Sequence, residues 1–133
     1  MSKDAKTAAD LRREGRSKLF GGDHSGAAKL LREAARREPE DAGGHYLLGV
    51  ACCRLGELRE AEASLKEAIR LQPKEPAYHA NLGWLYGTEL KNYAAAVEAY
   101  REALRLEPGN KDSRRELAEV ERKLQEARKG RRV

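Results

Sequence analysis

The sequence predicts an all-α protein built from repeated pairs of helices. Alanine, leucine, arginine and glutamate are abundant, while the aromatic residues are one Trp, one Phe and five Tyr. This is the composition of helices that pack through small side chains. A unit of 34 residues also recurs, marked by Gly15, Gly49 and Gly83, by Ala27, Ala61 and Ala96, and by Pro39, Pro73 and Pro108. Three copies of one helical unit follow.

Each copy is predicted to contain two helices that meet near a glycine. The first helix is predicted from Asp4 to Phe20, ending at Gly21-Gly22, because glycine tolerates the left-handed conformation that stops a helix. Ser25 is the predicted cap of the next helix, which runs to about Arg37. The remaining predicted helices are 42–55, 58–71, 76–88 and 93–106.

The small marker residues have a steric explanation. Gly49 and Gly83 are predicted to lie where the two helices of a pair approach closely, because larger side chains would push the axes beyond about 8–10 Å. The opposing positions are predicted to be filled by Ala61, Ala68, Ala96 and Ala103.

The pattern changes after Pro108. Residues 110–129 are predicted to form a helix with an apolar stripe of Leu117, Val120 and Leu124 that covers the last repeat. Residues 129–133 are predicted to be frayed. This segment also carries most of the charge excess, because residues 109–133 hold 9 basic and 5 acidic side chains.

The residues around the markers carry a family resemblance. The second copy reads His45-x-x-Leu48-Gly49-x-x-Cys52, then Ala61-x-x-x-Leu65 and Pro73, and the third repeats it from His79 to Pro108. This resembles the tetratricopeptide repeat, a helix-turn-helix of that length. The resemblance implies an α-α superhelix: three repeats within 1–108 (about 8–41, 42–75 and 76–109), then a capping helix and basic tail at 109–133.

Two places depart from the family pattern. The first copy has Glu14 and Lys18 where the others have apolar or aromatic residues, as expected for an end repeat that meets water. The third copy carries one extra residue within 87–92. That longer turn is expected either to relieve packing or to present a loop.

The resemblance implies that a peptide segment binds in a concave groove lined by the first helices of the repeats. The basic end would suit an acidic stretch of ligand, since guanidinium pairs well with carboxylate. Asn81 would pair with ligand amides and Trp84 would be an anchor. The implied groove residues are Arg12, Arg13, Arg16, Tyr46, Leu47, Val50, Arg54, Asn81 and Trp84.

A subset of this family grips the terminal carboxylates of heat-shock chaperones through a clamp of Lys, Asn and Arg. The clamp positions here hold Arg12, Arg16, Leu47, Ala77 and Asn81. An apolar residue thus replaces one asparagine and two cations are missing. Chaperone tails are therefore not the expected ligand.

The sequence offers little for catalysis, cofactors or metals. No nucleophilic triad, phosphate loop or zinc spacing is present, and His45 and His79 are expected to be packing residues. Cys52 and Cys53 are adjacent, with Cα atoms about 3.8 Å apart, so reduced thiols are expected. The charged N-terminus and the lack of long apolar runs favour a cytoplasmic protein without membrane contact.

Four functional hypotheses remain open. The leading one is an adaptor that binds a segment of a partner protein, and the second is a bacterial secretion or assembly chaperone that holds its cargo. Nucleic-acid contact through the basic terminal segment is a third, which would show a steep loss of binding with salt. The fourth is a fragment or engineered scaffold without a ligand. The sequence does not indicate the oligomeric state.

Overall fold

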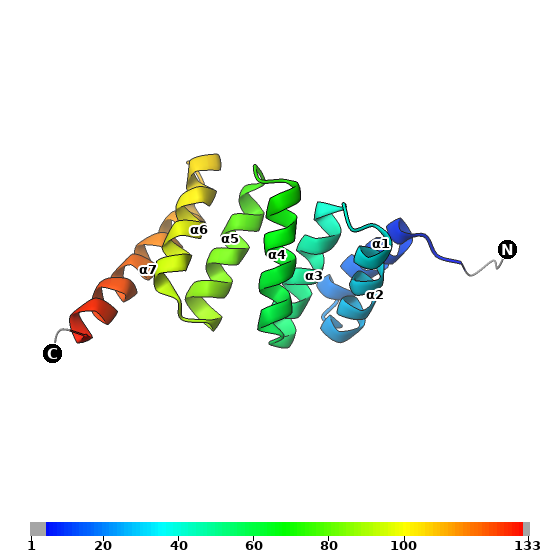
Figure 1. The fold of residues 1–133 in the computed structure, drawn as a ribbon, viewed down its shortest axis with the longest axis horizontal. Coiled ribbons are helices and arrows are strands. Elements are labelled where there is room, and N and C mark those ends of the chain that lie inside the picture. The colour runs from blue at the N-terminus through cyan, green and yellow to red at the C-terminus, as the bar shows by residue number, and fades with distance from the viewer. Residues whose placement is uncertain (1–4, 132–133) are drawn as a thin grey trace. The chain divides into compact units, whose positions relative to one another are not determined.

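A computed structural model describes residues 5–131 of the chain, and within this range it contains seven α-helices, one π-helical segment and no strand (Figure 1). The all-α prediction is confirmed. The elements are α1 (Ala8–Phe20), α2 (His24–Arg37), α3 (Ala42–Leu55), α4 (Leu58–Leu71), α5 (Pro76–Trp84), the π-helix η1 (Leu85–Glu89), α6 (Tyr93–Leu106) and α7 (Lys111–Gly130).

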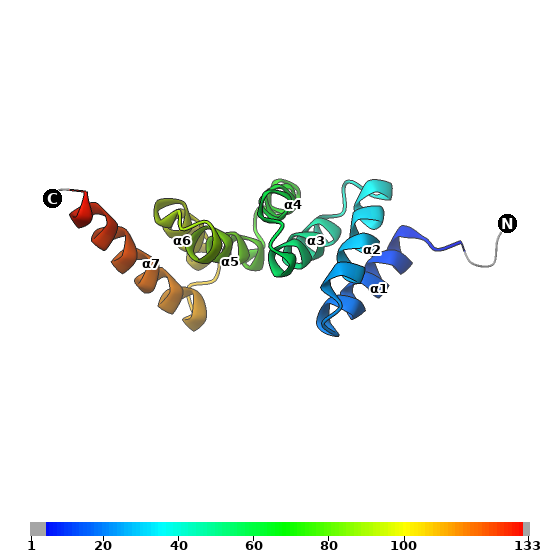
Figure 2. The ribbon, with the colours of Figure 1, turned by 90° about the horizontal axis from the view of Figure 1, so that it is seen from below.

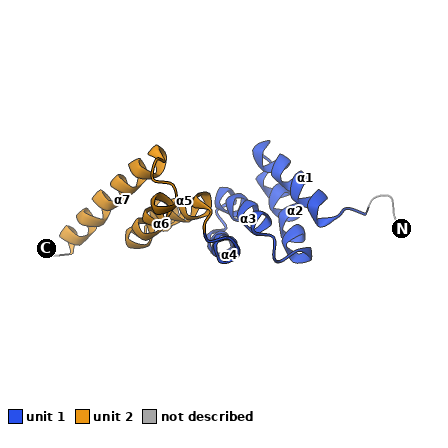
Figure 3. Cartoon of the chain, turned by 90° about the horizontal axis from the view of Figure 1, so that it is seen from above, with its two compact units in different colours: residues 1–73 blue, residues 74–133 orange. Residues whose placement is uncertain are grey.

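The chain divides into two compact units, residues 1–73 and 74–133 (Figure 3). In unit 1, α1 packs on α2, α2 on α3, and α3 on α4. In unit 2, α5 packs on α6, and α6 on α7, the helix drawn from orange to red in Figure 2. The division falls near the predicted start of the third repeat, and each unit is described by itself below.

The helix ends follow local capping chemistry. The first helix begins at Ala8 because Thr7 and Asp10 form a capping box, with the Asp10 N–H donating to the Thr7 hydroxyl at 3.1 Å. The predicted start at Asp4 lies outside the described residues. Asp23 caps α2, accepting from the Gly26 N–H at 2.9 Å, so the prediction that Ser25 is the cap was wrong. A carboxylate one position before the first helical residue is a better cap than a serine already inside the helix.

The prediction of close helix approach at Gly49 and Gly83 is confirmed. A Cβ on Gly49 would lie 2.8 Å from Leu65 Cγ and 3.4 Å from the Ala61 carbonyl oxygen. A Cβ on Gly83 would lie 3.0 Å from the Tyr100 ring. Ala61 is fully buried, as predicted, but the atoms nearest to the glycines belong to Leu65 and Tyr100. The missing side chain thus leaves room for a larger one on the partner helix.

The turn of the third repeat accommodates its extra residue within the helix. In the second repeat the turn passes through Gly56 at φ 77°. In the third repeat α5 ends at Trp84 and η1 follows, with the Leu90 N–H donating to the Leu85 carbonyl at 3.0 Å. A π-turn holds one more residue than an α-turn. The single predicted helix 76–88 is therefore two segments, and Lys91 takes the place of the turn glycine at φ 52°.

We expect Lys91→Gly to stabilise the protein by about 1 kcal/mol. A side chain with a Cβ is strained in the left-handed region, whereas glycine is not. The effect would appear as a higher midpoint in urea unfolding followed by circular dichroism. The reciprocal change Gly56→Lys places the same side chain at the equivalent turn, and should destabilise by a similar amount. Equal midpoints for both variants and the parent chain would show that the turn carries no strain.

The last helix covers part of unit 2. Val120 on α7 is buried, and its Cγ1 lies 2.9 Å from the position of a Cβ on Gly87. Leu117 and Leu124 remain partly exposed, so the predicted stripe is buried mainly at its centre. Lys129 and Gly130, which the sequence placed in a frayed end, belong to α7, and Arg132 and Val133 lie outside the described residues.

No helix within residues 5–131 combines the length and apolar character that a membrane crossing requires. Cys52 and Cys53 are reduced thiols, as expected from their adjacency.

Candidate functional site

A pocket of about 600 Å³ in unit 1 is lined by the three arginines expected at the basic end of the groove. Arg12, Arg16 and Phe20 line it from α1, where a spacing of four residues places them on one helix face. Ala9 and Arg13 of α1 also line the pocket, and residues of α3 complete its wall. The full lining is Ala9, Arg12, Arg13, Arg16, Phe20, Gly43, Tyr46 and Leu47.

The three arginines of this pocket differ in their partners. Arg12 Nη1 donates to Asp41 Oδ2 at 2.8 Å, and Arg13 Nη2 donates to Asp10 Oδ1 at 2.6 Å. Arg16 has no ion pair within residues 5–131, and its guanidinium carbon lies 5.6 Å from the centroid of the Phe20 ring. Arg16 is thus the pocket cation that is not yet neutralised by a carboxylate.

The carboxylate beside Arg13 stays ionised. The pKa of Asp10 is held below its ordinary value, mainly by a hydrogen bond from the Thr7 backbone N–H. Hydrogen bonds with the Thr7 side chain and with Arg13 lower it further. The Asp10 charge therefore offsets that of Arg13 throughout the neutral range.

The pocket also has apolar surface on which a ligand could pack. Phe20 is 74% exposed, which is unusual for so large an apolar side chain. Leu47 is 9% exposed and Tyr46 is half-buried. Cationic and apolar groups thus share one concave surface.

A second, smaller pocket of about 210 Å³ lies within unit 2. Trp84 at the end of α5 is 37% exposed, and Asn81, one turn earlier, donates from Nδ2 to the Ala77 carbonyl at 2.9 Å. Part of the amide that was predicted to serve a ligand is therefore used inside its own helix. The lining is Ala80, Asn81, Trp84, Tyr100, Asp112, Ser113 and Glu116.

The predicted groove residues fall into three groups. The first pocket gathers Arg12, Arg13, Arg16, Tyr46 and Leu47, and the second gathers Asn81 and Trp84. Val50 is half-buried and Arg54 is exposed, and neither lines these pockets. Their role as a peptide site stays a prediction.

Sequence reasoning missed the contribution of α7 to the second pocket. Asp112 and Glu116 are four residues apart, a spacing that places both carboxylates on one helix face. That spacing was visible in the sequence, but nothing indicated which side of α7 would turn toward α5. Ser113 was missed for the same reason.

The two equivalent histidines have structural surroundings. His45 donates from Nε2 to the Pro39 carbonyl at 2.8 Å, which ties the start of α3 to the preceding turn. His79 is 9% exposed. Both positions fit the expected packing role.

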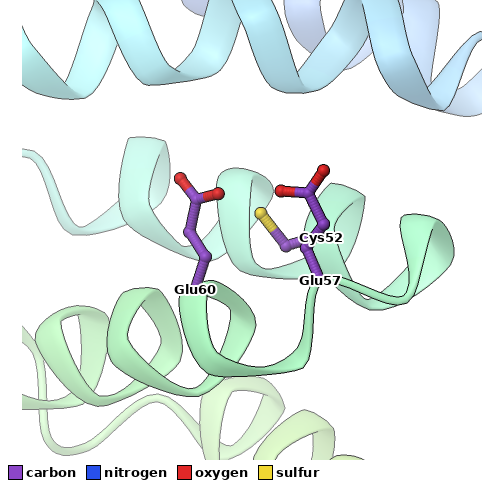
Figure 4. A group of neighbouring side chains, drawn as sticks. All are labelled: Cys52, Glu57 and Glu60. Atoms are coloured by element: carbon purple, nitrogen blue, oxygen red, sulfur yellow. The ribbon is translucent and has the colours of Figure 1, made fainter.

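A third group of polar side chains brings together Cys52, Glu57 and Glu60, whose sulfur and carboxylate oxygens lie within 4.8 Å of one another (Figure 4). Arg32 of α2 forms ion pairs with both carboxylates. Its Nε lies 2.8 Å from Glu60 Oε2, and its Nη2 lies 2.8 Å from Glu57 Oε2. The guanidinium thus links α2 to the start of α4 through two acidic residues.

This cluster has the chemistry of an ion-pair network. Burial, with a smaller contribution from Glu60, raises the pKa of the Cys52 thiol to about 12. A metal-binding cysteine must lose its proton, which the neighbouring carboxylates oppose. Arg32 also holds the pKa of Glu60 below its ordinary value. The residues fit an arginine better than a metal ion.

Known proteins resemble this chain in sequence and in fold. A curated relative, the Hsp70-Hsp90 organizing protein 1 of Glycine max, is 28% identical over 109 residues, which cover 82% of this chain. The chain spans only 19% of that relative's length.

Solved structures resemble the fold at lower identity. The first TPR of Spaghetti (RPAP3), bound to the HSP90 peptide SRMEEVD, has a TM-score of 0.85 and 21% identity, over 91% of this chain and 95% of its own. The Sgt2 TPR domain from Aspergillus fumigatus has a TM-score of 0.83 and 22% identity, over 92% and 82% of the two chains.

The family profile agrees with the repeat seen in the helices. The tetratricopeptide repeat profile matches residues 12–76, 54–111 and 89–129, in three overlapping stretches. These matches span α1 to α7, including the helical pairs that close over Gly49 and Gly83. The chain belongs to the tetratricopeptide repeat family.

Proposed function

We propose that this chain is a protein-interaction module whose arginine pocket, defined by Arg12, Arg13 and Arg16, binds an acidic peptide segment of a partner protein. The observation that carries the proposal is the meeting of three guanidinium groups with exposed aromatic surface in one cavity of about 600 Å³. Binding to this cavity would be a non-enzymatic function. The cytoplasm is the expected compartment.

The arrangement of charge favours one ligand chemistry. Arg16 can receive a carboxylate without giving up an ion pair, whereas Arg12 and Arg13 must share theirs with Asp41 and Asp10. The Arg16 guanidinium is held over the Phe20 ring, which reduces the freedom lost when a ligand binds. An acidic residue of the ligand would therefore lie nearest to Arg16.

The aromatic and aliphatic surface provides the rest of the affinity. An apolar ligand side chain that covers Phe20 removes a large exposed ring from water, at roughly 25 cal/mol per Å² of buried area. The preferred segment thus combines acidic residues with apolar ones.

The relatives support an acidic peptide without specifying its sequence. The RPAP3 domain was solved with SRMEEVD, a peptide rich in carboxylates. This chain has Leu47 and Ala77 at two of the positions where the chaperone-binding clamp has polar residues. We therefore expect a different acidic segment as ligand.

Selection from a random displayed peptide library tests the proposal. The full chain should enrich peptides in which Asp or Glu stands beside apolar residues, and these should compete with one another for binding. The variant Arg16→Glu should fail to retain them, while Arg59→Glu, an exposed arginine outside the pocket, should retain them. Enrichment without acidic residues, or equal capture by both variants, would refute the proposed site.

A further inference from the structure

The second pocket, within unit 2, has the opposite charge from the arginine pocket. Two of its lining residues, Asp112 and Glu116, are acidic, and no Lys or Arg lines it. Trp84, which is 37% exposed, also lines this pocket. An aromatic ring and carboxylates that line one pocket together attract cations.

The two carboxylates differ in how far they are already neutralised. Asp112 lies 3.2 Å from Arg115 Nη2, with both side chains highly exposed. Glu116 is half-buried and has no ion pair within residues 5–131. The neighbouring Arg114 does not pair with Glu116, because its Nη2 donates a hydrogen bond to the Pro108 carbonyl at 2.6 Å. Glu116 thus brings an uncompensated negative charge to the pocket.

The remaining polar groups are neutral and one of them lacks a partner. Burial, and then the nearby Glu116, raises the pKa of Tyr100, so its phenol stays protonated. Ser113 is only 4% exposed, yet its hydroxyl makes no hydrogen bond within the described residues and is not sealed from solvent. A buried hydroxyl at a pocket wall is expected to serve a ligand or a water.

We infer that this pocket binds the cationic side chain of a lysine or arginine in the peptide ligand. A ligand carboxylate would be repelled by Glu116, and an uncharged apolar side chain would strip water from that carboxylate without replacing it. A cation pairs with Glu116, lies against the Trp84 ring and can donate to Ser113. The cavity volume of about 210 Å³ suits one side chain rather than a folded surface.

This inference rests on the proposed function and extends it. The ligand preferred by the chain carries an acidic segment for the arginine pocket and, elsewhere in its sequence, a basic residue for the pocket of Trp84 and Glu116. From the sequence alone, only apolar and amide contacts were expected of Asn81 and Trp84.

Trp84 provides the measurement, because it is the only tryptophan in the chain. Its fluorescence should change saturably on titration with Nα-acetyl-lysine amide or Nα-acetyl-arginine amide, both of which keep the charged side chain. N-acetyl-norleucine amide, which keeps the aliphatic stem without the charge, should have little effect at the same ionic strength. Equal responses to the lysine and norleucine derivatives would overturn the inference.

Matched variants locate the effect. Glu116→Gln should weaken binding of the lysine derivative about tenfold, since a charge-assisted contact is lost. Glu121→Gln removes the same charge from α7 at a position outside the pocket and should leave binding unchanged. Equal affinities of the two variants would assign the cation to the general field of the helix, which contradicts the inference.

The peptides selected for the proposed function separate the two claims. Replacing their Lys and Arg residues by norleucine should weaken binding to the parent chain but not to Glu116→Gln. If that replacement leaves the affinity for the parent chain unchanged, the cation pocket is wrong while the acidic-peptide function stands. If no peptide is enriched at all, the proposed function fails, and with it the peptide as the source of the cation.

Discussion

Gly49→Leu is expected to destabilise unit 1 by about 3 kcal/mol, because overpacking of this kind strains a closely packed core. A Cβ at Gly49 would already lie 2.8 Å from the buried Leu65 Cγ, and the Ala61 carbonyl oxygen at 3.4 Å limits relaxation. The gain in helix propensity over glycine, about 0.8 kcal/mol, offsets only part of this cost. Total stabilities are about 5–15 kcal/mol, so the loss is large.

Urea unfolding followed by circular dichroism checks this expectation, and hydrogen exchange in α3 and α4 localises it. Gly109→Leu is the control, because a Cβ there meets no heavy atom within 4 Å. An unfolding midpoint for Gly49→Leu equal to that of the control would show that the two helices do not depend on this close approach.

Reversing the charge at Arg12 and Arg16 is expected to lower the affinity for acidic peptides about a hundredfold. It should also flatten the salt dependence of the association rate. Each reversal removes an attraction and adds a repulsion, and exposed charges act mainly on the association rate. A purely apolar peptide should bind nearly as before. Stopped-flow association at several salt concentrations measures both effects.

The reversal at Arg12 also disturbs its ion pair with Asp41, so a second variant is needed. Arg16→Glu alone breaks no ion pair within the described residues and should retain most of the effect. Reversal at Arg128 and Arg131, in the basic terminal segment, is the control and should change little. The opposite pattern would move the interaction site to that segment.

The fold was predictable because its periodic features are local. A glycine is needed where the two helices of a pair approach closely, as at Gly49 and Gly83. That need repeats with the unit of 34 residues. The helix ends were harder to predict, because Asp23 and Ser25 are both good capping residues. In the structure Asp23 is the cap of α2. The extra residue of the third repeat could be counted, but its placement in a π-turn depends on packing.

The candidate site was predictable only in part, because partners distant in sequence determine which charges are available. Arg12, Arg13 and Arg16 looked equivalent in the sequence, yet Asp41 and Asp10 engage two of them. The contact of Arg32 with Glu57 and Glu60 spans 25 and 28 residues and leaves no local signal.

The arginine pocket is the proposed place where an acidic peptide binds. The most direct measurement is a titration of the isotope-labelled chain with one selected acidic peptide, followed by backbone amide chemical shifts. We predict that the largest shift changes fall on Arg16, Gly43 and Tyr46, which line that pocket. Changes confined to the last turns of α7, around Arg128 and Lys129, would contradict the account.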